Sequence, residues 1–370
     1  MAGKGIMMKI LFIEPFFGGS HKDFAKGFKA HSCHDVTLVT LPDRFWKWRM
    51  RGSALYFAHH VKDFSVFDAI ITTDMMDLPD FLSLAGKNLP PVLMYFHENQ
   101  LSYPLAPTQK FDSHLGFTNI ISALAADKVF FNSRFHFNAF IEAADHLIKQ
   151  MPDQRPKWMI EEIRKKTKVV YPGCRFKKGI IDLKERELNK PLIIWNHRWE
   201  FDKNPEFFFD VLNGLKERDI PFSLALLGEK LERFPDVFKE AKEQFKEQLV
   251  AYGYVESRDE YLSWLKKGAI VVSCAIQENF GISVVEAARY GCIPLLPNRL
   301  SYPEIMPEDF HHQILYNTKK DLMGKLEDIL LNYQDYLPLQ KEISKNMELF
   351  SWEIIVKQYD SALKKFKKHG

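Results

Sequence analysis

The chain is poor in cysteine, with four in 370 residues and no Cys-x-x-Cys pair. Thiols scattered at Cys33, Cys174, Cys274 and Cys292 favour neither a zinc cluster nor a disulfide framework, so we expect reduced and mostly buried cysteines. No window approaches the ~18 consecutive apolar residues of a membrane-spanning helix, and residues 1–10 hold no signal-peptide core. The expected location is therefore the cytoplasm, with no stable membrane association.

A large charge of one sign is also lacking, because the net charge is only +3 while 46% of the residues are hydrophobic. Those values exclude the low-apolar, highly charged composition of disordered proteins. The length predicts two or three domains at ~150 residues each. Residues 1–187 carry 26 Lys and Arg against 20 Asp and Glu, whereas the remainder carries 25 against 28. The basic first half indicates either a solvated surface or an anionic partner.

Short apolar runs alternate with longer mixed segments along the chain, which is typical of βαβ units around a parallel sheet. The runs are apolar on both faces, as strands covered by helices on both sides must be. We therefore predict an α/β protein with two doubly wound sheets. The expected strands are residues 7–13, 36–41, 69–73, 92–96, 129–131 and 169–171 in the first half, and 192–195, 223–227, 251–254, 270–273 and 293–296 in the second.

Polar, strand-poor residues 177–190 predict a join between two domains, 1–187 and 188–350. Beyond them, residues 352–366 place Ile355, Tyr359 and Leu363 on one helical face. We expect residues 351–370 to contain an amphipathic helix that docks elsewhere on the protein.

Ligands of open α/β sheets bind beyond the carboxyl ends of the strands, so candidate residues are sought there. The segment EPFFGGSHK, residues 14–22, follows the first expected strand. Gly18 and Gly19 would let the backbone approach a ligand closely, and Ser20 would open the next helix and leave amides for an anion or a sugar hydroxyl. A plain strand-to-helix turn capped by Ser20 is the structural alternative.

Four polar residues follow the strand at 92–96, namely His97, Glu98, Asn99 and Gln100. Burying them without partners would be costly, whereas a ligand cleft would use them as donors and acceptors. His97 is the strongest candidate for a functional role, with a purely structural histidine as the alternative.

In the second half, Arg198 and Lys203 follow the strand at 192–195, and Lys203 lies at the start of a helix. A guanidinium and an ammonium at this spacing form a clamp for two linked phosphates, or else a solvated surface pair. Further on, in ENFGISVVEA at 278–287, Gly281 permits a sharp turn into a helix that carries Glu286. Glu278 and Glu286 are paired carboxylates that can accept hydrogen bonds from vicinal sugar hydroxyls.

The E-x7-E spacing, the upstream Arg-x4-Lys, His97 and the final helix together resemble the family 4 retaining glycosyltransferases of GT-B fold. Several blocks are similar, over nearly the full length, to the tRNA-queuosine mannosyltransferases. These blocks are EPFFGGSHK at 14–22, LPDRFWKWR at 41–49, SALYF at 53–57, YFHENQLSYP at 95–104, FNS at 131–133, RPK at 155–157, HRWEFDKNPEFFF at 197–209, LLGE at 226–229 and YPEI at 302–305.

The resemblance implies two Rossmann-like domains facing each other across a cleft, with the last helix crossing back to the first domain. The second domain would hold most of the nucleotide-sugar donor. Arg198 and Lys203 would stabilise the departing diphosphate, Glu278 would orient the hexose, and Glu286 would bind the ribose. The catalytic residues would be His97, Glu278, Arg198 and Lys203, and the other donor-binding residues would be Gly18, Gly19, Tyr254, Val255, Phe280, Gly281, Ile282 and Glu286.

The same resemblance puts the acceptor on the first domain. Its candidate binding residues are Ser20, His21, Trp46, Trp48, Arg49, Glu98, Asn99 and Gln100. An RNA acceptor calls for cations interleaved with rings, which residues 44–51 and the basic residues between 155 and 178 provide. An amphipathic helix with a wet basic face would give the same pattern.

The implied reaction is transfer of mannose from GDP-mannose to the queuosine base of a tRNA with retention. No acid/base pair with glycosidase separation is evident, which favours front-face displacement with the departing phosphate taking the acceptor proton. No metal, no cofactor beyond the nucleotide-sugar substrate and no obligate protein partner is expected, and Asp74 and Asp77 are assigned to helix capping or to the acceptor side. A family 4 enzyme with a lipid or glycan acceptor, or a non-catalytic nucleotide-sugar or tRNA-binding protein, remain the alternatives.

Overall fold

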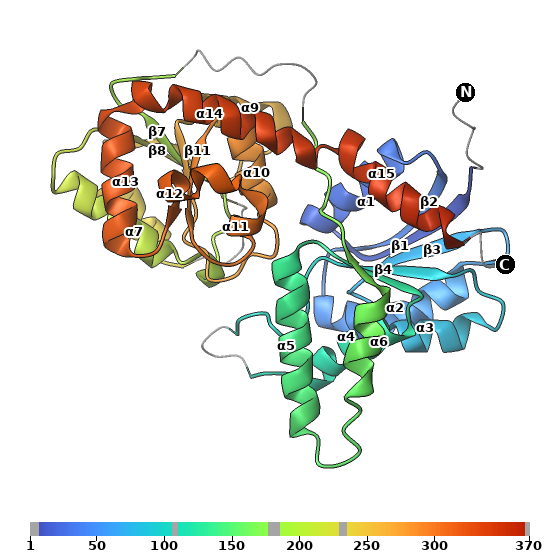
Figure 1. The fold of residues 1–370 in the computed structure, drawn as a ribbon. Helices are drawn as coiled ribbons and strands as arrows, with labels where there is room; N and C mark the ends of the chain where they lie inside the picture. The colour runs from blue at the N-terminus through green and yellow to red at the C-terminus, as the bar shows by residue number, and fades with distance from the viewer. Residues whose placement is uncertain (1–6, 106–109, 177–185, 229–234, 367–370) are drawn as a thin grey trace. The chain divides into compact units, whose positions relative to one another are not determined.

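The computed structural model describes residues 7–105, 110–176, 186–228 and 235–366. Its contacts divide the chain into two compact units. The N-terminal unit comprises Met1–Arg175 with Phe350–Gly370, and the C-terminal unit comprises Phe176–Leu349. Each unit is built on a six-stranded parallel sheet with helices against it (Figure 1). The division falls before the expected join at residue 187, and most of the expected linker lies outside the described residues.

The N-terminal sheet has the strand order β2-β1-β3-β4-β5-β6. Its central strands β3 and β4 are buried along their whole length because helices cover both faces. The strands are β1 (Lys9–Phe17), β2 (Asp35–Pro42), β3 (Ala69–Thr73), β4 (Val92–Phe96), β5 (Lys128–Phe131) and β6 (Thr167–Val169). The helices of this unit are α1 (Gly19–His31), α2 (Trp46–His60), α3 (Leu78–Ala85), α4 (Ser113–Ala125), α5 (Arg134–Gln150), α6 (Trp158–Lys166) and α15 (Trp352–Lys364).

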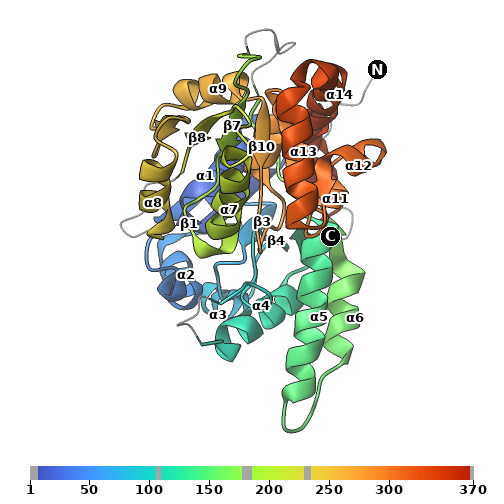
Figure 2. The same ribbon diagram turned by 90° about the vertical axis from the view of Figure 1, so that its left-hand side faces the viewer.

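Two hydrophobic clusters fill the two faces of the N-terminal sheet. Residues of α2 to α6 pack on one face, and residues of α1 and α15 pack on the other. Figure 2 shows α5 and α6 running side by side on the first face. Because α15 supplies six of the 19 buried residues of the second cluster, residues 350–366 belong to the core of this unit although they lie far from it in sequence.

Trp352 is the anchor of α15. Its side chain is 2% exposed and lies against Gly27 of α1 and Gly173, where a Cβ would come within 2.1 Å and 2.2 Å of the indole. Backbone bonds tie the same place together, since the Cys174 amide donates to the Phe350 carbonyl at 2.6 Å and the Trp352 amide donates to the Cys174 carbonyl at 3.2 Å. The two glycines therefore leave space that only this ring fills.

The C-terminal sheet has the strand order β12-β11-β10-β7-β8-β9. Strands β8 and β9 are added on one side of β7 and strands β10 to β12 on the other, so the strand order reverses between β7 and β10. The strands are β7 (Leu192–Trp195), β8 (Ser223–Leu226), β9 (Leu249–Tyr252), β10 (Ile270–Val272), β11 (Ile293–Pro297) and β12 (Leu315–Tyr316). The helices are α7 (Pro205–Lys216), α8 (Val237–Gln244), α9 (Arg258–Lys267), α10 (Ile282–Arg289), α11 (Tyr302–Ile305), α12 (His311–Ile314), α13 (Lys319–Leu331) and α14 (Leu337–Asn346), with short 3-10 turns such as η1 (Phe201–Lys203).

Some elements differ from the sequence prediction. Strand β1 continues through Glu14 to Phe17 with an irregular register, so the expected loop begins later. Strand β6 ends at Val169 instead of starting there, and the two-residue strand β12 was not expected. Three of the cysteines are buried, Cys33 is exposed, and all four are free thiols. In the part of the chain that is described, no helix combines the length and apolarity needed to cross a bilayer.

Candidate active site

Polar side chains gather at the carboxyl edge of each sheet, where the strand order reverses. In the N-terminal sheet the reversal lies between β1 and β3, and in the C-terminal sheet it lies between β7 and β10. Such switch points are where open α/β sheets bind ligands.

A fully buried carboxylate, Glu14 on β1, organises the N-terminal group. Its Oε1 accepts hydrogen bonds from the Phe16 amide at 2.9 Å and the Thr73 hydroxyl at 3.0 Å, and it pairs with His21 Nδ1 at 3.2 Å. Its Oε2 is buried and has no hydrogen-bond partner among the described residues. Because an unsatisfied buried carboxylate oxygen is costly, this atom marks a place where a ligand, a proton or a water would be stabilised.

His97 follows β4 directly and stacks near the His21 ring, with 4.0 Å between ring centroids. Its backbone amide donates to the buried Asp74 carboxylate at 2.7 Å, and its carbonyl accepts from Asn132 at 2.8 Å. The rings of Phe24 and Tyr95 pack edge-on against it at 5.0 Å and 4.8 Å. The imidazole is thus held in a fixed place at the edge of the sheet.

The charges of this group are strongly perturbed. Burial opposes protonation of His21, but the Glu14 carboxylate outweighs it and raises the pKa of His21 to about 9. Burial and the neighbouring His21 charge lower the pKa of His97 well below its ordinary value. Burial raises the pKa of Asp74 to about 7 despite the attraction of His21. At neutral pH the group therefore pairs a charged His21 with a neutral His97, the type of contrast found at functional sites.

The donor atoms of Glu14, His21 and His97 lie within 4.8 Å of one another, which is close enough for a metal ion. The raised pKa of His21 means that a metal would have to displace a firmly held proton. The absence of a metal from the reaction remains a prediction.

The β1–α1 turn differs in detail from the prediction. Helix α1 begins at Gly19, and its N-cap is Gly18 without a side-chain cap, so the alternative of a turn capped by Ser20 is wrong: Ser20 lies exposed within the first turn. Gly19 has the positive φ of +47° that favours glycine. At Gly18 a Cβ would come within 1.9 Å of the Asp43 carboxylate, so the missing side chain admits Asp43.

The remaining acceptor candidates fall into two kinds. Asn99 is buried, and its side chain binds the Leu101 and Ser102 amides at 3.0 Å and 2.9 Å, which shapes the turn after His97. Glu98 and Gln100 are partly buried beside it and hydrogen-bond to each other at 3.3 Å.

On helix α2, Trp46 packs partly buried against Met50, and Trp48 is 62% exposed. Arg49 donates to the Pro42 carbonyl at 3.2 Å. Trp48 is thus the ring of this helix that is open to an acceptor.

In the C-terminal unit, Lys203 is the centre of the second group. It is 7% exposed, and its Nζ donates to the Gln277 carbonyl at 2.8 Å and lies 3.1 Å from Asp202 and 3.4 Å from Glu278. Burial alone would lower the pKa of Lys203, but the two carboxylates outweigh it and raise the value. The structure therefore brings the predicted Lys203 and Glu278 together with the ammonium charged.

Arg198 follows β7, and its positive charge opposes the two carboxylates by acting to lower the pKa of Lys203. Its guanidinium is 44% exposed and pairs with Glu200 at 3.1 Å. The neighbouring His197 is buried, contacts Ser283 Oγ at 3.2 Å, and has a pKa lowered to about 4 by burial and by Lys203. His197 therefore links the loop after β7 to the start of α10.

Helix α10 begins where the sequence predicted. Its N-cap is Gly281 with φ +94°, and a Cβ there would also crowd the Tyr302 ring at 3.2 Å. Phe280 is buried, and Ser301 Oγ donates to its carbonyl at 3.1 Å, while Ile282 is partly buried. The turn between Glu278 and α10 is thereby fixed, and the helix amides are left at its tip.

Glu286 is 8% exposed on α10 and forms a bidentate pair with Arg258 of α9. One oxygen is 3.2 Å from Nη1, and the other bonds Nη2. A carboxylate has about four lone-pair sites, so this pairing leaves acceptor capacity for other donors. Beyond β9, Tyr254 is 54% exposed and Val255 partly buried, at the same carboxyl edge of this sheet.

Sequence reasoning missed Glu14, Asp43 and Arg258 as site residues. Glu14 had a usable signal, since a single carboxylate in an apolar run predicted to be buried on both faces needs an explanation. No sequence signal pointed to Arg258 or Asp43, because the residues that they contact are distant in sequence or follow no spacing rule.

Taken together, the two groups offer a neutral imidazole and buried carboxylates at one sheet edge, and a charged lysine, an arginine and two carboxylates at the other. Cations at a helix tip suit a diphosphate, and fixed carboxylates suit sugar hydroxyls.

Comparison with known proteins agrees with this chemistry. A family model described as tRNA-queuosine alpha-mannosyltransferase N-terminal matches residues 9–174, and one described as glycosyl transferases group 1 matches residues 179–349. Among solved structures, a sucrose-phosphate synthase from Thermosynechococcus elongatus has a TM-score of 0.75 at 14% identity, covering 98% of this chain and 100% of that one. A glycosyltransferase from Rickettsia africae has a TM-score of 0.67 at 16% identity, covering 98% and 100%.

Fold and domains thus define a glycosyltransferase of the GT-B class. A tRNA-queuosine alpha-mannosyltransferase of Drosophila melanogaster is 38% identical over 330 residues, which cover 86% of this chain and 85% of that protein. The chain belongs to the tRNA-queuosine alpha-mannosyltransferase family.

Proposed function

We propose that this protein transfers a mannosyl group from GDP-mannose to the queuosine base of a tRNA, with retention at the anomeric carbon. The observation that carries the proposal is the 38% identity to a tRNA-queuosine alpha-mannosyltransferase across both units. The buried charge arrangement around Lys203 supports the phosphate half of the reaction.

In the proposed mechanism the acceptor hydroxyl attacks the anomeric carbon on the face from which the diphosphate leaves. The bond between that carbon and the phosphate oxygen breaks, and the departing phosphate oxygen takes the hydroxyl proton. Lys203 and Arg198 stabilise the charge that develops on the diphosphate, which is the step where fixed cations contribute most. Lys203 suits this role because its raised pKa keeps it charged. This route uses neither a metal nor a further cofactor.

Glu278 orients the transferred hexose, helped by amides near Phe280 and Gly281, and Glu286 accepts from the ribose hydroxyls beside Arg258. The backbone at Tyr254 and Val255 contacts the base. His97 lies near the acceptor hydroxyl, and its lowered pKa leaves it neutral and able to accept a hydrogen bond.

The test is to incubate the purified protein with queuosine-containing tRNA and, in separate reactions, GDP-mannose, GDP-glucose, UDP-glucose and UDP-galactose, and then to measure nucleoside masses. A hexose-sized gain on queuosine with GDP-mannose alone is the expected result. The same tRNA lacking queuosine is the matched control. A gain only with another donor overturns the donor assignment, and hexose transfer to a lipid or glycan without any transfer to tRNA overturns the acceptor.

A further inference from the structure

A hollow lined mainly by basic side chains lies at the amino ends of the strands of the N-terminal sheet, which is the end opposite to His97. Its floor is the amino ends of β5 and β6, marked by Asp127, Lys128 and Lys168, whereas His97 follows the carboxyl end of the parallel strand β4. Helix α15 forms its other wall. The volume is about 440 Å³, which is within the range of ~300–1,000 Å³ typical of ligand pockets.

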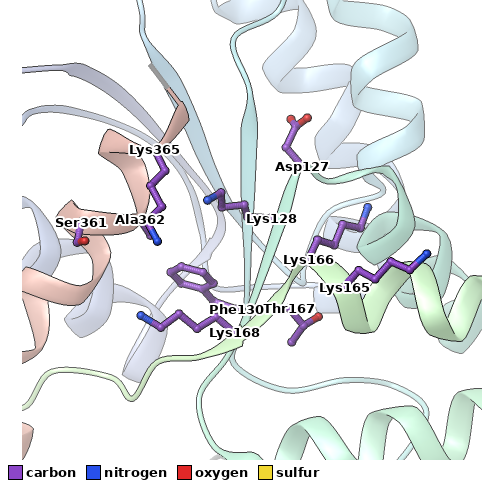
Figure 3. A pocket seen from close by; sticks show the side chains of 10 residues that line it. All are labelled: Asp127, Lys128, Phe130, Lys165, Lys166, Thr167, Lys168, Ser361, Ala362 and Lys365. Carbon is purple, nitrogen blue, oxygen red and sulfur yellow. The ribbon is translucent and has the colours of Figure 1, made fainter. Parts of the chain in front are cut away.

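The lining is dominated by lysines, shown in Figure 3. The side chains of Lys128 and Lys168 are directed toward α15, whose end is followed by Lys365, whereas Lys165 and Lys166 lie on α6 at the far side. We call Lys128, Lys168 and Lys365 the lysine cluster. Lys168 and Lys365 are exposed, and burial together with the charges of Lys365 and Lys168 lowers the pKa of Lys128.

The lysines of α6 are bound to a helix end and to a carboxylate of their own helix, and Lys128 lies over the Phe366 ring at 5.1 Å. The Lys166 ammonium donates to the carbonyls of Leu124 and Ala126 at the end of α4, and Lys165 pairs with Glu162 at 2.6 Å. Lys128 on β5, Lys168 on β6 and Lys365 just after α15 lie far apart in sequence and converge on one hollow. Like charges held together by packing repel each other, and a bound anion would relieve that repulsion.

The carboxylates that line the region are already engaged. Asp127 accepts from the Val92 amide at 2.7 Å. A second hollow of about 530 Å³ adjoins the first, sharing Ser361 and Lys365 and adding Lys357 and Lys364. Its Asp360 accepts from Ser32 Oγ at 2.6 Å and the Cys33 amide at 3.0 Å. The two hollows therefore form a continuous cationic track across α15.

We infer that the lysine cluster and this track are a second RNA-binding site, which contacts backbone phosphates of a tRNA away from the reacting base. The inference rests on the proposed function for the identity of the RNA. A track of two adjoining hollows suits an extended polyanion better than one small phosphate. The track lies at the amino ends of the strands, whereas His97 lies at their carboxyl ends. The track therefore binds a part of the RNA other than the nucleotide that reacts.

The first experiment measures binding of unmodified tRNA to the full chain by fluorescence anisotropy at several salt concentrations. The double variant Lys168→Gln/Lys365→Gln should bind roughly tenfold more weakly near 0.1 M salt, and the slope of log affinity against log salt should shrink by about 1–2. Lys62→Gln/Lys87→Gln, which removes two exposed lysines from the same unit, is the charge-matched control and should leave both quantities unchanged. Equal affinity and slope in the wild type and the cluster variant would overturn the inference.

Two further arms separate the explanations. In the first, inorganic tripolyphosphate is titrated by calorimetry. If it loses its binding in the cluster variant while tRNA affinity stays the same, the hollow is a small-anion site and the RNA assignment is wrong. In the second, hexose transfer should show a raised KM for queuosine tRNA but an unchanged KM for free queuosine nucleoside. Because the binding arm uses unmodified tRNA, its result stands even if no hexose is transferred and the proposed function fails.

Discussion

Glu14 sets the charge state of its neighbours. Its buried carboxylate is the main reason that His21 keeps a proton in a site where burial would otherwise remove it. The charged His21 in turn helps to keep His97 neutral. One carboxylate therefore determines which of two adjacent imidazoles carries the charge.

Glu14→Gln should lower the pKa of His21 from about 9 to below 6.5, because desolvation is then largely unopposed. A titration of the ring by NMR checks this. The stabilisation by the Glu14–His21 pair is fully present below 6.5 and is lost as the pH rises through about 9, since the folded pKa is the raised one. The stability gap between the wild type and the variant should narrow over that range. Glu98→Gln is the control and should move the His21 titration far less, and an unchanged titration in Glu14→Gln would show that Glu14 is not the cause.

Lys203→Ala should reduce kcat for hexose transfer by roughly 10²–10³-fold, the typical cost of losing one fixed group that stabilises developing charge. Steady-state kinetics with queuosine tRNA and GDP-mannose is the measurement, with circular dichroism to verify folding. Lys216→Ala, on the exposed side of α7, is the matched control and should retain activity. Full turnover by Lys203→Ala would refute the assignment to the diphosphate.

At the scale of elements, α15 is held in part by the buried ring of Trp352. Trp352→Ala should destabilise the protein by about 3–5 kcal/mol, because the cavity beside Gly27 and Gly173 has no side chain to fill it. Urea unfolding followed by circular dichroism measures the change. Ile354→Ala, on the same helix but 38% exposed, should cost less than ~1 kcal/mol. Similar losses of unfolding free energy in the two variants would mean that the packing of Trp352 stabilises the protein no more than an exposed side chain of the same helix does.

Local pattern predicted most elements because a doubly wound fold imposes continuous apolar strands and amphipathic helices. Strands β3, β4 and β7 have the predicted bounds, and α15 buries the apolar stripe of Ile355, Tyr359 and Leu363 as an amphipathic helix should. The errors lie where tertiary contacts decide. Strand β1 runs on to Phe17 because β2 continues to pair with it, and β12 is too short to show any periodicity.

The candidate site was predictable to the extent that its residues follow strands. His97, Lys203 and Glu278 could be found because each lies just beyond a strand or at a helix start. The close approach of Asp43 to Gly18 and the ion pair between Arg258 and Glu286 could not be predicted, because both depend on how helices and loops pack.

For the whole molecule, the division into two compact units predicts which fragments of the chain fold on their own. Residues 176–349 contain a complete sheet and should fold as a separate polypeptide. Residues 1–175 alone lack α15 and should expose the apolar face around Phe24 and Tyr95, whereas joining 350–370 to residue 175 through a flexible linker should restore a cooperative fold. Amide NMR spectra and urea unfolding of the three fragments test this. A well-dispersed spectrum and equal stability for residues 1–175 without α15 would contradict it.

The late position of Trp352 also bears on how the protein is made. On the ribosome, the first sheet emerges well before the residues that complete the cover of one of its faces, so a nascent chain must wait through the synthesis of an entire second unit with only α1 on that face. Molecular chaperones that shield apolar surface would be needed during this interval, and the yield of active enzyme in a cell should depend on them.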